Sequence, residues 1–167
     1  MPQRNDIADD TFLFNQGPTR GLGKIQFADY NKAFELYDLP NVKIFKKQVD
    51  IFKESLFKAS PTEAQTKNID VMLTVGEMFT LVPYAQLILE NAKINGVDHL
   101  VVDQIFDFIV RDFSKFALEL YSKPSSTEKQ MEYCKKMMIK PNVDDKRFMA
   151  VWETHVYNHK DAYEMNL

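Results

Sequence analysis

A glycine-rich stretch near the N-terminus is the first place where this sequence could support chemistry. Residues 12–25 read FLFNQGPTRGLGKI, and a Gly-Lys pair in such a stretch can cradle a phosphate. A P-loop needs G-x-x-x-x-G-K followed by Ser or Thr, because backbone amides wrap the phosphate and the hydroxyl holds magnesium. Five residues separate Gly17 from Gly23, and Ile25 stands where the hydroxyl is required. We therefore expect an arm that docks through apolar side chains, not a nucleotide site.

Two histidines near the C-terminal end have a spacing that can bind a metal. His155 and His159 are four residues apart, with Glu153 nearby, so all three could approach one cation from one helix face. No further ligand cluster accompanies them, and this spacing is more typical of a solvated helix face. The Glu-x-x-His repeat of di-iron bundles is absent from the sequence. We predict no metal site, with His155 and His159 as the residues to inspect.

Cys134 is the single cysteine of the chain and lies in EYCKKMM. Neighbouring lysines could lower the pKa of its thiol, whereas a buried cysteine would be inert. A buried, unreactive cysteine is the commoner case. A single cysteine cannot form an internal disulfide and fits a reducing compartment, so we expect a cytoplasmic location.

Charged residues inside two strongly apolar segments are the most informative candidates for a site. Glu77 interrupts VMLTVGEMFTLV, and three charged residues recur every four positions along the second segment: Asp103, Asp107 and Arg111. Because burying an unpaired carboxylate is costly, we expect Glu77 to pair with Arg111 or an equivalent donor in the interior. The functional alternative makes Glu77 a catalytic base or ligand contact in a cleft. Pro83 predicts a kink in the first segment, and we expect a pocket there.

The elements that would position these residues are helices. The apolar spacing predicts an all-α, antiparallel bundle of four to six helices around two long central ones, IDVMLTVGEMFTLVPYAQLILENA and VVDQIFDFIVRDFSKFALEL. Asn95-Gly96 predicts the turn between them, with Asp98 as an N-cap. Ser60 with Glu63, and Ser125 with Glu128, fit capping boxes that open two further helices. A short helix should end before Pro40, and another should run from about Asp144 to near His159.

Composition favours one soluble domain. The 167 residues are 45% hydrophobic, which suffices for one core, and we assign residues 27–167 to the bundle and 1–26 to an extended arm. The arm carries Phe12, Phe14, Leu22 and Ile25, and Phe27 follows it. A net charge of −3 gives no footprint for nucleic acid. No stretch reaches the roughly 18 uncharged apolar residues of a membrane span. We therefore expect that the chain binds neither nucleic acid nor a membrane.

The order of several segments resembles the C-terminal portion of bacterial acyl-CoA dehydrogenase-like flavoproteins. These segments are FLFNQGPTRGLGKIQFADY, GEMFTLVPYAQLILENA, DQIFDFIVRDFSKFALEL, SKPSSTEKQ and DAYEMNL. The resemblance implies a helical module from enzymes in which FAD oxidises an acyl thioester and a glutamate removes the α-proton. None of the family's flavin-binding or catalytic motifs can be placed on this chain. Glu77 is therefore not assigned as the base, and no catalytic residue is assigned.

Two functional hypotheses follow. In the first, the chain is a C-terminal helical module that contributes to assembly or to one wall of an acyl pocket and is inactive alone, with FAD present only in a full-length relative. In the second, it is a free-standing helical interaction or small-ligand-binding protein. The partner in the first case is a second copy, giving a homodimer, or an acyl-CoA dehydrogenase-like domain.

Overall fold

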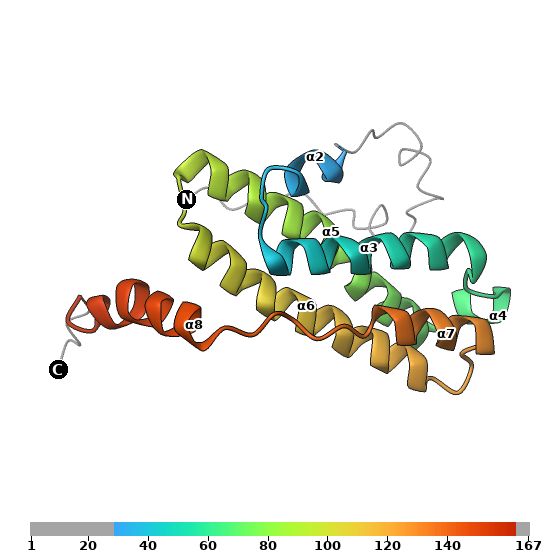
Figure 1. The fold of residues 1–167 in the computed structure, drawn as a ribbon. Helices are drawn as coiled ribbons and strands as arrows, with labels where there is room; N and C mark the ends of the chain where they lie inside the picture. The colour runs from blue at the N-terminus through green and yellow to red at the C-terminus, as the bar shows by residue number, and fades with distance from the viewer. Residues whose placement is uncertain (1–28, 163–167) are drawn as a thin grey trace, which may run out of the picture.

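The computed structural model describes residues 29–162, and the expected arm at residues 1–26 with its glycine-rich stretch lies outside the described residues. The described part is all α-helical, as the sequence predicted (Figure 1). It contains seven α-helices, one more than the upper end of the expected four to six. They are α2 (Tyr30–Phe34), α3 (Pro40–Lys58), α4 (Glu63–Thr66), α5 (Ile69–Asn95), α6 (His99–Ser122), α7 (Glu128–Met137) and α8 (Asp145–Val151).

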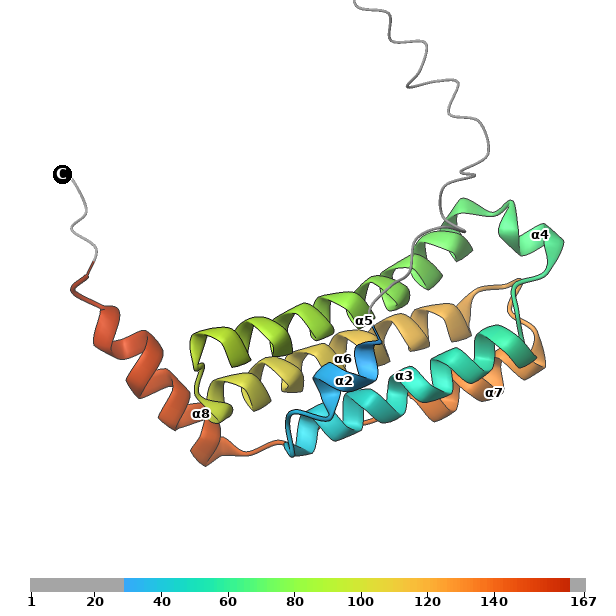
Figure 2. The same cartoon turned by 90° about the horizontal axis from the view of Figure 1, so that it is seen from above.

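Helix α6 is the centre of the bundle. It packs against α3, α5, α7 and α8, whereas α5 packs against α6 and the short helices α2 and α4. Seen from above, α5 forms one edge of the bundle, and α3 and α7 form the opposite edge (Figure 2). The prediction of two central helices was therefore half correct. Helix α6 is central, but α5 is peripheral, and the other described helices leave one of its sides uncovered.

The turn between α5 and α6 forms as the sequence predicted. Gly96 has φ of 62°, a left-handed conformation that residues with a Cβ rarely adopt, and it ends α5. The Asp98 side chain then accepts a hydrogen bond from the Leu100 amide at 2.8 Å and caps α6. The two long helices consequently run antiparallel and side by side (Figures 1 and 2).

Aromatic rings fill the space between α3 and α6. Phe45 lies edge-on to Phe106 and Phe113, with ring centroids 5.8 and 5.6 Å apart, and Phe52 contacts Phe113 in the same way at 5.7 Å. Such pairs contribute about 0.5–1.5 kcal/mol each beyond their buried area. The sequence spacing predicts an apolar stripe of Phe45, Val49, Phe52 and Leu56 on α3. The first three are buried, whereas Leu56 is 36% exposed.

Both capping boxes exist, but each is shifted by two residues from its predicted position. The capping residues are Thr62 with Gln65 and Thr127 with Gln130. The two glutamine side chains are buried and bond each other reciprocally, at 2.9 and 3.0 Å. Glutamine serves as well as glutamate at this position, and its amide also donates, which glutamate cannot do. The prediction of Glu63 and Glu128 in this role was therefore wrong.

Two further boundaries differ in detail from expectation. Pro40 opens α3 as its first residue, while α2 ends earlier, at Phe34. Proline suits the first helical position because its missing amide would be unpaired there anyway. The C-terminal helix is confirmed, with Asp144 as its cap, and continues as a π-helical turn η2 (Trp152–Val156) and a 3₁₀ turn η3 (Tyr157–His159). This segment extends away from the bundle (Figures 1 and 2).

Candidate functional site

The structure places Glu77 on the exposed side of α5, so the predicted buried pair with Arg111 does not form. The buried residues nearest to Glu77 on this helix are Thr74 and Met78. Each residue turns the helix by about 100°, so the neighbour of a buried residue faces well away from the core. The prediction was wrong because it took α5 to be buried on every side.

Asp107 and Arg111 do belong to a polar network, in which a different arginine is central. Asp107 is buried and pairs with the half-exposed Arg111 at 2.6 Å and with the buried Arg147 at 3.2 Å. Arg147 also pairs with Asp103 at 2.5 Å, and its Nε donates to Gln104 Oε1 at 3.1 Å. Arg147 was not predicted from the sequence. Its position in the first turn of a helix capped by Asp144 is the one sequence feature that could have indicated it.

The network extends to the start of α3 through Asn41. The backbone amide of Asn41 donates to Asp103 Oδ1 at 2.9 Å. Its side chain exchanges hydrogen bonds with the backbone of Asn142, which also accepts from Arg147 Nη2 at 3.0 Å. The carboxylates are thus engaged by cations or amides, which is the state of a structural cluster and not of a catalytic base.

The candidate metal ligands do not converge in the structure. His155 and His159 are both exposed, on η2 and η3. Within residues 29–162 no group of three or more His, Cys, Asp or Glu side chains is placed to hold a metal ion. His99 is the first residue of α6 and packs edge-on to Tyr37, with ring centroids 5.5 Å apart.

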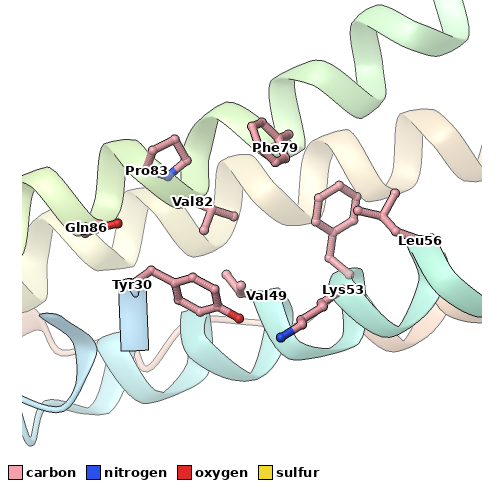
Figure 3. Close-up of a pocket in the computed structure, with 9 residues that line it drawn as sticks. Tyr30, Val49, Lys53, Leu56, Phe79, Val82, Pro83 and Gln86 are labelled. Atoms are coloured by element: carbon pink, nitrogen blue, oxygen red, sulfur yellow. The ribbon is translucent and has the colours of Figure 1, made fainter. Parts of the chain in front are cut away.

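An apolar groove lies where the sequence predicted a pocket, beside Pro83. It encloses about 270 Å³ between α3 and α5, and Figure 3 shows residues of both helices facing it. Pro83 has no amide hydrogen, so the carbonyl four residues earlier, that of Phe79, loses its helical partner at this point. The groove is lined by Tyr30, Val49, Phe52, Lys53, Leu56, Phe79, Val82, Pro83 and Gln86.

Polar groups stand only at the margin of this groove within the described residues. The Tyr30 hydroxyl and the Lys53 ammonium point toward one another on the α3 side, and Gln86 lies on α5 (Figure 3). Burial, reinforced by the charges of Asp50 and Asp29, raises the pKa of Tyr30 above its usual value. The phenol is therefore protonated at neutral pH, and the groove offers apolar contacts with no nucleophile or base inside it.

A second apolar surface, the α5 stripe, follows the outer side of that helix. We define it by five residues that are between 56% and 81% exposed: Ile69, Leu73, Tyr84, Leu87 and Ile94. They recur at helical spacing over 25 residues, or about 38 Å of helix. No charged residue lies on the line that joins them, where Gly76, Thr80 and Asn91 complete the row. Monomeric proteins rarely expose so long an apolar row.

The same composition makes α5 resemble a membrane-spanning helix by length and hydropathy. Its most apolar window of 18 residues has a mean hydropathy of 1.4, and 22% of that window is buried. Core helices of soluble proteins can reach the same length and hydropathy, but they are mostly buried. The value is high here because both sides of α5 are apolar: one packs on α6, and the other carries the α5 stripe.

Comparisons with known proteins found no match to a family model, a curated protein or a solved structure. The resemblance to acyl-CoA dehydrogenase-like flavoproteins therefore stays a prediction.

Proposed function

We propose that this chain is a non-catalytic helical assembly module, of the kind implied by its resemblance to the C-terminal portion of acyl-CoA dehydrogenase-like flavoproteins. The observation that carries the proposal is the α5 stripe. Full burial of each of its large side chains would stabilise a contact by roughly 1.5–3 kcal/mol of free energy. A helix that keeps five of them exposed has a strong drive to associate.

The shape of the stripe favours assembly over the wall of an acyl pocket. Ligand pockets enclose about 300–1,000 Å³ and surround a small molecule. The α5 stripe instead runs for about 38 Å along one helix, which matches the length of another helix laid against it. We propose a second copy of the chain as the partner, so that two α5 helices would cover each other in a symmetric dimer.

Light scattering on the full chain tests the proposal. The wild type should change from monomer to dimer as its concentration rises. Leu73→Glu with Leu87→Glu should weaken the association at least ten-fold, because each charge would be buried in the interface. Phe57→Glu is the matched control, since Phe57 is 80% exposed but lies on α3, and it should leave association unchanged.

Two results would overturn the proposal. One is a wild type that stays monomeric at every concentration. The other is a wild type that binds neutral lipid vesicles through Leu73 and Leu87 without forming dimers. The purified chain should also lack the visible absorption of a flavin, because none of the family's flavin-binding motifs can be placed on its sequence.

A further inference from the structure

We propose that the groove between α3 and α5 is the docking site of the chain's own residues 25–27, which only Ala28 separates from the described part. This inference does not depend on the assembly proposal, because the groove and the α5 stripe use different residues. Ile25 and Phe27 would supply the side chains that fill the groove. The occupant would thus be part of the same molecule and neither a ligand nor a partner.

The groove lies beside the start of the described chain. Tyr30 lines the groove, and the described chain begins at Asp29, one residue earlier. Phe27 is three residues before Tyr30 and Ile25 five, so an extended chain reaches about 10 and 17 Å from Tyr30. The wall that α3 contributes runs from Val49 to Leu56, seven residues or about 11 Å. The two side chains can therefore span the groove from end to end.

The alternation of apolar and polar side chains in residues 24–27 fits the groove. Ile25 and Phe27 are two residues apart, with Gln26 between them and Lys24 before. In an extended segment, residues two apart point to the same side, so both apolar groups would face the groove while Lys24 and Gln26 face water. The groove presents apolar walls with polar groups at the margin, which is the complementary pattern.

Residues 25–27 would compete with any free molecule for the groove. A segment joined to Tyr30 by so few residues is present at the groove at an effective concentration in the millimolar range. A free molecule of similar apolar surface would have to exceed that concentration to displace it. A second copy of the chain would face the same disadvantage. The tethered segment is therefore the favoured occupant.

A cysteine placed in the groove reports whether it is covered. Phe79→Cys puts a thiol on the α5 wall, and the natural Cys134 gives little background, because it is buried. The rate of reaction with a water-soluble disulfide reagent is measured in the full chain. It should rise at least ten-fold when Ile25→Asp and Phe27→Asp are added, since aspartates would leave the groove.

Two controls isolate the effect. Phe12→Asp makes the same chemical change far from Tyr30 in the sequence and should leave the reaction rate of the thiol at position 79 unaltered. Leu87→Cys places a thiol on α5 outside the groove, and its rate should not respond to the aspartates at positions 25 and 27. Circular dichroism checks that each variant keeps its helical content.

A second measurement avoids disruptive substitutions. A photoreactive benzophenone side chain at position 27 should crosslink within one chain to α3 or α5 after irradiation. An unchanged reaction rate of the thiol at position 79 would overturn the proposal. So would protection that grows with protein concentration, which would indicate a second copy, or protection that disappears after unfolding and refolding on a washed column, which would indicate a bound small molecule.

Discussion

Cys134 shows how the surroundings of a single side chain decide its chemistry. It is 1% exposed on α7, and burial raises the pKa of its thiol to about 11. The lysines that follow it do not activate it. Lys135 lies over the ring of Tyr121 and Lys136 over that of Tyr133, both as cation–π contacts. Of the two interpretations open from the sequence, the inert buried cysteine is confirmed.

The raised pKa of Cys134 predicts a loss of stability at alkaline pH. The thiol ionises in the unfolded chain near pH 8.5, while the folded chain holds its proton up to about pH 11. Between these values the unfolded state binds fewer protons, so the free energy of unfolding should fall by up to about 1.4 kcal/mol per pH unit. Urea unfolding at pH 8 and pH 10 measures the change. Cys134→Ser should show a smaller decrease, because only the tyrosines and lysines then titrate.

At the scale of elements, the turn between α5 and α6 depends on one glycine conformation. Gly96 has positive φ, and a Cβ added to it would meet no atom within 4 Å. Any cost of a substitution there is therefore due to the backbone and not to a clash. Gly76 lies inside α5 and has equally open surroundings, but its φ is not positive. The two glycines therefore have equally open surroundings, but only Gly96 adopts a left-handed backbone conformation.

Substituting these glycines by alanine should change stability in opposite directions. Gly96→Ala should lower the free energy of unfolding by about 1–2 kcal/mol, because the left-handed conformation is strained for alanine. Gly76→Ala should raise it by about 0.4–1 kcal/mol, because alanine favours the helix and restricts the unfolded chain. Thermal or urea unfolding followed by circular dichroism measures both. Equal effects from the two variants would contradict this account of the turn.

The sequence was sufficient for the elements because their signals are local. The turn between α5 and α6 depends only on Gly96 and Asp98, which are two residues apart. Helix α3 is indicated by the spacing of Phe45, Val49 and Phe52 within two turns. Which side of α5 would be covered depends on distant segments, and an apolar helix gives no periodic signal for it. For the same reason the sequence placed Glu77 in the core and missed Arg147, whose partners lie about 40 residues away. The pocket beside Pro83 was predictable because proline removes a hydrogen bond at a known position.

At the scale of the whole molecule, one arginine joins elements from the two ends of the described chain. Arg147 on α8 bonds Asp103 and Asp107 on α6, and Asp103 in turn accepts from Asn41 at the start of α3. The segment between α7 and α8 is held in the same network through the carbonyl of Asn142. The projecting C-terminal helix is thus anchored at its first turn, whereas Trp152 and Tyr157 further along it are exposed.

Removal of this arginine should destabilise the fold strongly. Arg147→Met keeps most of the side-chain volume but leaves Asp103 buried without its cation, and breaking a buried pair typically costs about 3–5 kcal/mol. Lys58→Met is the control, because the Lys58–Glu54 pair is exposed and exposed ion pairs contribute little to stability. Urea unfolding compares the two variants. A loss below about 1 kcal/mol for Arg147→Met would show that water reaches the carboxylates.

The reciprocal bond between Gln65 and Gln130 has a consequence for how the molecule opens. Each glutamine closes its own helix start and also bonds the backbone of the opposite loop, Gln65 at Ser125 and Gln130 at Ala59 and Ser60. Neither loop can leave its position without exposing the polar groups of the other. The first amides of α4 and α7 should therefore exchange their hydrogens with deuterium at a common rate, as one cooperative unit, although 65 residues of chain separate the two glutamines.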